Sequence, residues 1–325
     1  MAWKRGLTHQ RNEALLIQAQ SLTKHYGSKT AVDSVDFTVQ PGKVTGFLGP
    51  NGAGKSTTMR MIAGLDRPSL GSVIVNGKPY HEHKAPLREV GVLLDAKAVH
   101  TGRSAFNHLR AMAATHSIPT SRVHEVINLT GLESVARKRV GGFSLGMGQR
   151  LGIAAALLGD PATLILDEPV NGLDPEGVQW VRKLTKQLAA EGRTVLLSSH
   201  LMSEMALTAD HIIVLGRGRV IADASVTDII ASAAQNTVRV RTPHTAALAT
   251  LLAQTDVTIT NTEQDVLEIT GLSVNEIGDR AAAAQISLHE LSAVSASLEE
   301  AYMKLTQNEV EYRTGDTHPE AEVAR

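Results

Sequence analysis

Residues 49–56 read Gly49-Pro50-Asn51-Gly52-Ala53-Gly54-Lys55-Ser56 and match the pattern G-x-x-x-x-G-K-[ST] in full. A short apolar strand is predicted before this run, at 43–48, and a helix ended by glycine is predicted after it, at 57–65. A strand, a glycine loop and a helix start together aim backbone N–H groups and the positive end of the helix dipole at one point. The arrangement indicates a cradle for nucleotide phosphates, against the alternative of a glycine-rich turn that binds nothing.

The side chains of this loop suit phosphate chemistry. Lys55 would reach the β- and γ-phosphates of a nucleotide, and the Ser56 hydroxyl would ligate magnesium. The candidate nucleotide-binding residues are therefore all of 49–56 together with Thr57. The motif alone does not specify which nucleotide is used.

A second motif, Leu164-Ile165-Leu166-Asp167-Glu168-Pro169, places two acidic residues directly after an apolar strand. Because the carboxyl ends of parallel strands meet at one edge of a sheet, both carboxylates would lie beside the phosphate loop. Asp167 would hold magnesium, directly or through water, and Glu168 would orient and deprotonate the attacking water. The alternative is a pair of acids that simply ends a strand in solvent, which the upstream loop disfavours.

The composition is that of an ordinary globular chain of 325 residues, with 42% apolar and 20% charged residues and a net charge of −1. No long basic run is present, so we expect no nucleic acid as a partner. The absence of cysteine excludes disulfides, thiolate nucleophiles and cysteine-based metal sites, and it fits a reducing cytosol. No apolar run reaches the roughly 18–20 residues of a membrane-spanning helix, so any work at a membrane would depend on a partner.

Hydrophobic patterning predicts an α/β domain over residues 15–230 with a helical insert over about 95–158. Continuous apolar runs at 162–166 and 194–198 are typical of central parallel strands covered on both faces, and a helix is predicted between them at 175–190. Further strands are expected within 17–40 (two, joined by a turn), 71–77, 90–94 and 211–222 (two).

A second, smaller α+β domain is predicted over 231–313, with the element order β-α-β-β-α-β-α of a split-βαβ sandwich. Its first helix is expected to start at Thr242-Pro243, with a cap and a proline at the first position. A strand is expected at 286–288, and the last helix opens with the capping box of Ser297 and Glu300. Residues 1–14 are expected to form a flexible arm and residues 314–325 a disordered tail.

Ser144 lies in the run Phe143–Leu151, just before an apolar helical stretch. Alone it would be an ordinary helix cap, although its hydroxyl and the local N–H groups could also present an anion site. In context the run resembles the ABC signature, normally read L-S-G-G-Q. The phosphate loop, this run, the Asp-Glu-Pro strand, the loop 171–174 and Ser198-Ser199-His200 have the order and spacing of the nucleotide-binding subunit of an ABC transporter. The resemblance covers about residues 17–228.

The resemblance implies a chain that binds ATP and magnesium and pairs head to tail with a second copy. Tyr26 stands at the place of the aromatic that stacks on adenine, the alternative being a core tyrosine at a strand end. His200 stands at the place of the switch histidine that contacts the γ-phosphate, although a lone histidine after a strand is usually structural. The loop 171–174 would touch the opposing subunit. Ser144 and Gly146 would act across the homodimer on the partner's nucleotide.

Three positions depart from the family pattern. Leu145 replaces the first glycine of the signature and Met147 replaces its glutamine. Asp95 stands where the family has a glutamine; an acid can accept bonds from magnesium-bound water but cannot donate as an amide does. These departures are similar to the bacitracin- and daunorubicin-exporter branch of bacterial ABC ATPases, some of which carry a C-terminal extension.

The resemblance implies a P-loop ABC ATPase that hydrolyses ATP and drives export, of a drug or antibiotic, through a separate integral membrane permease. It would lie in the cytoplasm on the inner face of the cell membrane. The alternative is a soluble ABC ATPase acting on a macromolecule; such proteins usually carry two ATPase domains or a long coiled coil, and neither pattern is present. A module that binds ATP without hydrolysing it is disfavoured by the presence of both Glu168 and His200. Dimer stabilisation and regulation both stay open as roles for residues 231–313.

Overall fold

The computed structural model describes residues 16–96, 98–233, 237–294 and 296–307. These residues divide into two compact units, one of 16–226 with 305–307 and one of 227–304. The predicted flexible arm at 1–14 and the predicted disordered tail at 314–325 lie outside the described residues.

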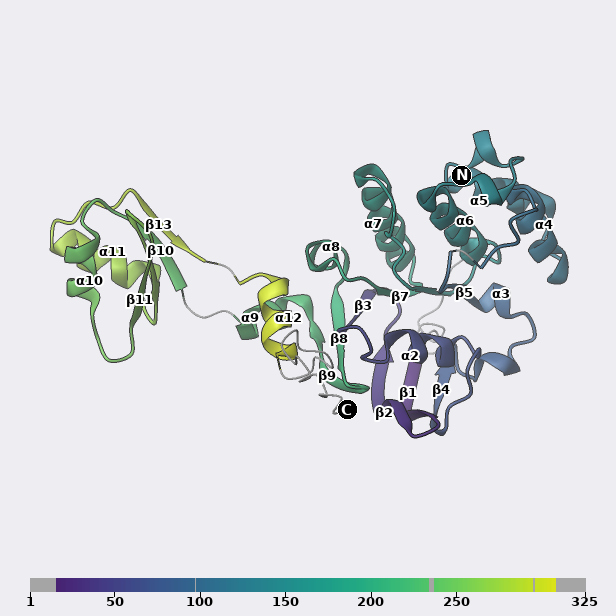
Figure 1. Ribbon diagram of the computed structural model, residues 1–325, viewed down its shortest axis with the longest axis horizontal. Helices are drawn as coiled ribbons and strands as arrows, with labels where there is room; N and C mark the ends of the chain where they lie inside the picture. Colours follow the sequence, from purple (N-terminus) through teal and green to yellow (C-terminus); the bar gives the residue numbers. More distant parts are fainter. Residues whose placement is uncertain (1–15, 97, 234–236, 295, 308–325) are drawn as a thin grey trace, which may run out of the picture. The chain divides into compact units, whose positions relative to one another are not determined.

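A six-stranded sheet forms the centre of the first unit (Figure 1). Its strands in spatial order are β5 (Val90–Leu93), β6 (Thr163–Leu166), β7 (Thr194–Ser198), β3 (Val44–Leu48), β8 (His211–Gly216) and β9 (Arg219–Ser225). Neighbours are parallel from β5 through β8, and β9 joins antiparallel to β8. Every residue of β3, β6 and β7 is buried, which confirms the central strands predicted from continuous apolar runs.

A three-stranded antiparallel sheet packs against this one, in the order β2 (Lys29–Val39), β1 (Ile17–Tyr26) and β4 (Leu70–Val75). Strands β1 and β2 form the predicted hairpin. One apolar cluster joins the two sheets, and in it the Phe37 ring of β2 lies 5.6 Å from the Phe47 ring of β3. The helix that follows the phosphate loop, α2 (Lys55–Ile62), buries Met59 and Ile62 in the same cluster, so the loop is anchored at both ends by core packing.

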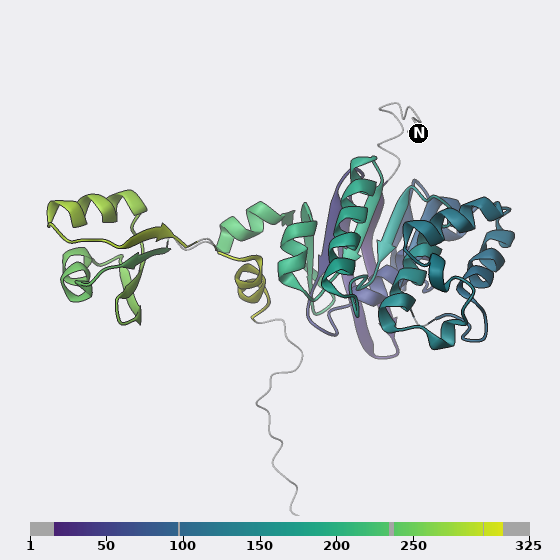
Figure 2. The same ribbon diagram turned by 90° about the horizontal axis from the view of Figure 1, so that it is seen from above.

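The helical insert and the helix between β6 and β7 follow the predicted pattern. The helical insert contains α4 (Ala105–Thr115), α5 (Thr120–Leu129) and α6 (Leu145–Leu157), which pack on one another, and α6 also packs against β5. The insert is the blue-green group of helices on the right of both views (Figure 1, Figure 2). Helix α7 (Pro175–Ala190) occupies the range predicted for it, between β6 and β7. The shorter helical segments are Tyr80–Glu82, α3 (Pro86–Glu89), Glu133–Val135, Val140–Gly142 and α8 (Met202–Thr208).

Helix α6 approaches β5 so closely that a glycine is required between them. A Cβ added at Gly91 would lie 2.1 Å from the Ala156 carbonyl oxygen and 2.9 Å from Pro161 Cγ. We expect Gly91→Ala to lower the free energy of unfolding by about 3 kcal/mol, because backbone atoms must move to admit the methyl group. Chemical denaturation followed by circular dichroism would measure the change. Gly142→Ala is the matched control, since a Cβ there meets no atom within 4 Å; an equal loss in both variants would contradict the packing argument.

Residues 227–304 contain a four-stranded antiparallel sheet with the spatial order β11 (Thr258–Glu263), β12 (Val266–Thr270), β10 (Thr237–Arg241) and β13 (Glu290–Ala293). Helices α10 (Thr245–Leu252) and α11 (Val274–Ala283) pack on it, and their shared core includes Val240, Leu248 and Ile277. Helix α9 (Val226–Ala233) precedes β10, and α12 (Leu298–Thr306) follows β13. The predicted order β-α-β-β-α-β-α is confirmed from β10 to α12.

The predicted start of the helix that follows β10 is wrong. Helix α10 begins at Thr245, and its N-cap is His244 rather than Thr242. The reason is that Thr242 is fully buried and its hydroxyl is already engaged. That hydroxyl donates to the Ser287 carbonyl at 2.8 Å and accepts from the His244 N–H at 3.1 Å.

The strand predicted at 286–288 is also misplaced, because β13 runs over Glu290–Ala293. Ile286 and Leu288 are used to pack against the core of the unit, and the pairing of β13 with β10 starts only at Glu290, opposite Arg241. The predicted capping box of α12 is confirmed. The Ser297 N–H donates to Glu300 Oε2 at 2.8 Å, and the Glu300 N–H donates to Ser297 Oγ at 3.1 Å.

Candidate active site

The phosphate loop connects the carboxyl end of β3 to the first residue of α2, Lys55. Its glycines take backbone conformations that side chains rarely adopt, with φ of 153° at Gly49 and 100° at Gly54. Space is missing as well, since a Cβ on Gly49 would lie 2.5 Å from the Leu215 carbonyl and one on Gly54 would lie 2.6 Å from the Ala31 carbonyl. These constraints explain why the motif requires glycine at both positions.

The Lys55 ammonium folds back over the loop. Its Nζ donates to the Gly49 carbonyl at 2.5 Å and to the Pro50 carbonyl at 3.1 Å. Burial lowers the pKa of Lys55, while the carboxylates of Glu168 and Asp167 act in the opposite direction. The Lys55 ammonium is thus held beside two carboxylates at the N-terminus of α2. A phosphate chain could bind the ammonium and the helix N-terminus, and a divalent cation could bind the carboxylates.

Asp167 follows the last residue of β6 and faces the loop. Ser56 Oγ donates to Asp167 Oδ2 at 3.0 Å, so the two predicted magnesium ligands are brought together. The other carboxylate oxygen, Oδ1, accepts from Ser198 Oγ at 2.5 Å. A hydroxyl and a carboxylate are hard oxygen donors of the kind magnesium prefers, so the residues present fit that ion.

Glu168 follows Asp167, and side chains hold its backbone at both the N–H and the carbonyl. Its φ is 50°, a conformation that costs free energy for a residue other than glycine. The Glu168 N–H donates to Ser198 Oγ at 3.0 Å, and the Glu168 carbonyl accepts from Gln149 Nε2 at 2.7 Å. The surroundings therefore fix the direction in which the carboxylate points.

The Glu168 side chain meets the predicted switch histidine. Its Oε2 lies 2.8 Å from His200 Nδ1, and the His200 ring is 63% exposed while the Glu168 side chain is 26% exposed. Both groups thus stand at the surface of the same sheet edge as Lys55 and Asp167. An attacking water could be held here between an acceptor and an imidazole.

Ser198 bridges the two acids, since its hydroxyl donates to Asp167 and accepts from the Glu168 backbone. We expect Ser198→Ala to lower kcat for ATP hydrolysis about tenfold, with a smaller effect on KM, because the variant loses two hydrogen bonds, one that holds the Asp167 carboxylate and one that holds the Glu168 backbone. Steady-state phosphate release would measure both constants. Ser292→Ala, which removes a serine hydroxyl in the other unit, is the control, and an unchanged kcat in Ser198→Ala would remove Ser198 from this role.

Tyr26 ends β1, and its ring is half exposed. Its hydroxyl donates to Asp66 Oδ2 at 2.7 Å, and this hydrogen bond is the main reason that the pKa of Tyr26 is raised. The alternative of a core tyrosine is wrong, because 49% of the residue is accessible. The ring is therefore available to a planar ligand.

The signature residues lie at the start of α6. Ser144 is its N-cap, accepting from the Met147 N–H at 3.2 Å, so the capping role is realised within the chain. Gly146 packs against the loop 171–174, since an added Cβ would lie 2.9 Å from the Gly172 carbonyl. Ser144 and Leu145 are exposed, and Asp95 is exposed just beyond the carboxyl end of β5. The structure thus joins Gly146 to the 171–174 loop of its own chain and leaves Ser144 facing solvent.

Three residues of the site received no role from sequence reasoning: Ser198, Gln149 and Asp66. Ser198 could have been found, because it ends the strand next to β6 and so must lie beside Asp167. Gln149 belongs to the quoted signature run, but its bond to the Glu168 carbonyl spans 19 residues. Asp66 carries no local sequence signal for its contact with Tyr26, which spans 40 residues.

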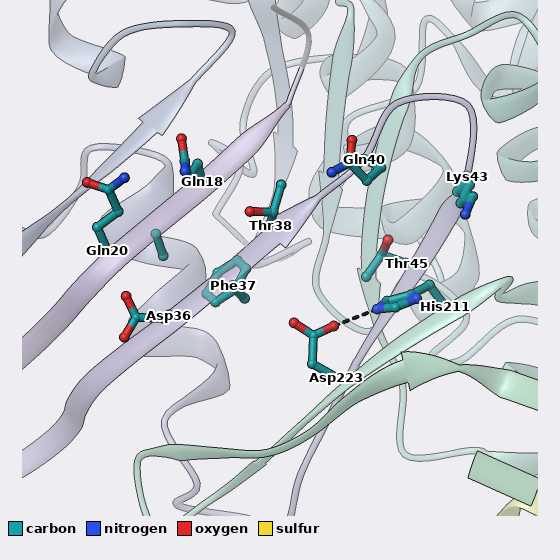
Figure 3. A pocket seen from close by; sticks show the side chains of 11 residues that line it. Gln18, Gln20, Asp36, Phe37, Thr38, Gln40, Lys43, Thr45, His211 and Asp223 are labelled. Carbon is teal, nitrogen blue, oxygen red and sulfur yellow. Dashed lines mark hydrogen bonds and ion pairs between the residues drawn. The ribbon is translucent and has the colours of Figure 1, made fainter. Parts of the chain in front are cut away.

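A cavity of about 550 Å³ lies elsewhere in the first unit, between β2 and the starts of β3 and β8 (Figure 3). Its polar wall includes Gln18, Thr38 and Lys43, and His211 pairs there with Asp223 at 2.5 Å. Residues that begin parallel strands lie at the opposite sheet edge from residues that follow them. This cavity is therefore separate from the phosphate loop.

Comparisons with known proteins bear on this geometry. The family model described as ABC transporter matches residues 32–171. The ABC transporter ATP-binding protein YhcH of Bacillus subtilis (strain 168) is 34% identical over 294 residues, which cover 90% of this chain and 96% of YhcH. The chain belongs to the ATP-binding proteins of ABC transporters. The family resemblance and the predicted fold class are thereby confirmed.

Other matches refine the position of this ABC protein. The bacitracin transport ATP-binding protein BcrA of Bacillus licheniformis is 41% identical over 209 residues, covering 63% of this chain and 68% of BcrA. A solved structure described as the ATP binding subunit of an ABC transporter is 28% identical, with a TM-score of 0.61, and covers 67% of this chain and 92% of that one. A family described as a domain of unknown function matches residues 236–299. The predicted kinship with bacitracin transport ATPases is confirmed.

Among the described residues, none of the helices is both long enough and apolar enough to cross a bilayer.

Proposed function

We propose that this ABC protein hydrolyses magnesium-bound ATP as a homodimer and drives export through a separate membrane permease. One observation carries the proposal: Lys55, Ser56, Asp167, Glu168 and His200 come from three segments and meet at one edge of the central sheet. That edge also carries the start of α2, which no side chain caps. The set contains a phosphate-binding cation, hard oxygen ligands and a carboxylate base.

Each residue has a distinct role in the proposed reaction. The loop 49–56 and Thr57 would bind the phosphates, with Lys55 donating to the terminal group. Ser56 and Asp167 would hold magnesium, which when bound neutralises charge on the β- and γ-phosphates. Glu168 would accept a proton from the attacking water, and His200 would orient that water and the γ-phosphate beside it.

The proposed homodimer accounts for the exposed signature. Ser144 already caps α6, and the N-terminus of that helix can accept the γ-phosphate of a nucleotide held by a second copy. The loop 171–174 packs on Gly146, and the Asn171 N–H of this loop donates to the Glu168 carbonyl at 3.2 Å. Through this loop, binding of the partner's nucleotide at Ser144 and Gly146 would be coupled to Glu168. Asp95, beyond β5, would sense the permease side of the site. Closure requires ATP to favour the paired state over the open one.

The proposed cargo is a drug or antibiotic, because BcrA is by its printed name a bacitracin transport protein. The protein would then sit in the cytoplasm, held to the inner face of the membrane by the permease. The proposed domain limits are 15–230 for the ATPase and 231–313 for the accessory domain. A soluble ABC ATPase with a macromolecular partner is the rival, and nothing in the described residues favours it.

The test is to search the reading frames that neighbour this gene for a hydrophobic protein with several membrane spans and to co-express that protein with this chain. We expect the two to co-purify in detergent and the ATPase rate to rise when the pair is reconstituted in vesicles. Loss of co-purification together with an unchanged rate would favour the rival. Size-exclusion light scattering of Glu168→Gln with ATP tests the homodimer, since a monomer under these conditions would contradict it.

A further inference from the structure

We propose that Asp66, braced by Arg60, is a positioning residue that fixes the Tyr26 ring for stacking on the adenine base. The inference rests on the proposed function, in which Tyr26 contacts the base. It adds a specificity-determining pair that lies outside the sequence motifs of the site.

Tyr26 and Arg60 meet on the same carboxylate. The Tyr26 hydroxyl donates to Asp66 Oδ2 at 2.7 Å. Arg60 donates to both oxygens, from Nε to Oδ2 at 2.8 Å and from Nη2 to Oδ1 at 3.0 Å. A bidentate guanidinium fixes the plane of a carboxylate, and the Asp66 side chain is only 16% exposed. The oxygen that receives the phenol therefore has a set position.

The ion pair of Arg60 and Asp66 connects the Tyr26 ring to the helix that follows the phosphate loop. Arg60 lies on α2, whose first residue is Lys55. The chain reverses at Gly64, where φ is 68°, and the N–H groups of Leu65 and Asp66 both donate to the Arg60 carbonyl, at 2.9 and 3.3 Å. Asp66 is thus held to the end of the helix whose start would hold the phosphates. The spacing between base and phosphate sites is set through one rigid element.

One face of the ring already has a neighbour. Lys24 Nζ lies 5.0 Å from the centroid of the Tyr26 ring and donates to the Arg67 carbonyl at 2.7 Å. A cation over one face leaves the other for a second planar group, and Tyr26 retains 49% exposure. A ring held at its hydroxyl and on one face is preorganised, which reduces the entropic cost of stacking.

The hydrogen bonds that join Arg60, Asp66 and Tyr26, here called the clamp, persist over the pH range in which the protein would work. The bonds from Arg60 and then from Tyr26 lower the pKa of Asp66 to about 2. The carboxylate therefore stays charged from weakly acidic to alkaline pH, and ATP affinity should show no transition that belongs to Asp66 in that range.

The test is equilibrium binding of ATP and of inorganic tripolyphosphate, which has no base, to the full chain in EDTA. We expect Tyr26→Ala to weaken ATP binding about tenfold, the value of one stacked base, and to leave tripolyphosphate binding unchanged. Asp66→Ala and Tyr26→Phe should each weaken ATP binding about threefold to tenfold, again without affecting tripolyphosphate. The double variant Tyr26→Phe/Asp66→Ala should be no weaker than either single one, because both remove the same bond.

Glu263→Ala is the matched control, since Glu263 accepts from Arg239 at 3.0 Å in the other unit and should bind both ligands normally. If Asp66→Ala leaves ATP binding unchanged while Tyr26→Ala weakens it, the clamp is refuted and the base contact stands. If Asp66→Ala weakens both ligands equally, the residue supports the fold of α2 and the inference also fails. If Tyr26→Ala has no effect on ATP, the base contact of the proposed function itself fails.

Discussion

Glu168→Gln is expected to lower kcat for ATP hydrolysis by about 10²- to 10⁴-fold while leaving ATP binding intact. Glutamine keeps the length of the side chain and can still contact His200 Nδ1, which lies 2.8 Å from Glu168 Oε2. It cannot accept a proton from water, so the loss isolates general-base catalysis from positioning. The backbone bonds from Gln149 and to Ser198 do not involve the carboxylate and should survive the change.

Phosphate release under steady state measures the loss, and equilibrium ATP binding measures what remains. Glu191→Gln is the matched control, because Glu191 pairs with Arg193 at 3.0 Å on the surface and has no part in the site. Its kcat should stay within twofold of the parent, a factor that corresponds to a change of about 0.4 kcal/mol in the activation free energy. A fully active Glu168→Gln variant would assign the proton to another group and leave Glu168 without its proposed role.

Most of the fold of the ATPase unit follows from local signals. Helix α7 is bounded by Asp174, which accepts from the Gly177 N–H, with proline at its first position, and by Gly192 just past its end. The central strands follow from apolar runs that only a doubly covered sheet can bury. The errors in the second unit have the opposite origin. Thr242 looked like a cap, but its hydroxyl is taken by Ser287, a residue 45 positions away.

The site divides in the same way. The motifs place Lys55, Ser56, Asp167 and Glu168 because strand order and loop chemistry alone bring them to one sheet edge. Ser198 follows from the same strand order, because it ends the strand next to β6. Asp66 acts through a side-chain contact that spans 40 residues, and no periodicity encodes it. An aspartate after a helix is common, so only the folded structure shows its contact with Tyr26.

Lys55→Ala is expected to weaken ATP binding about 100-fold, because each charge-assisted hydrogen bond contributes roughly 1.5–3 kcal/mol and Lys55 can offer more than one. Without ligand its ammonium is occupied by the Gly49 and Pro50 carbonyls, at 2.5 and 3.1 Å, so binding exchanges these acceptors for phosphate oxygens. The exchange is favourable because the competing acceptors are neutral. Removing the ammonium also takes one hydrogen bond from each of these carbonyls, although the Pro50 carbonyl still accepts from the Ala53 N–H at 3.2 Å, so the loop requires a separate check.

Isothermal titration should show that Lys55→Ala loses the same factor in affinity for ATP and for tripolyphosphate, since both ligands present the phosphates. Tyr26→Ala, in contrast, should lose affinity for ATP alone. Lys43→Ala is the control, because Lys43 lines the cavity at the opposite sheet edge and lacks access to the loop. In the absence of nucleotide, Lys55→Ala should change Tm by much less than ATP raises the Tm of the parent protein. If Lys55→Ala binds tripolyphosphate as the parent does, the phosphates are held elsewhere and the loop 49–56 is not the nucleotide site.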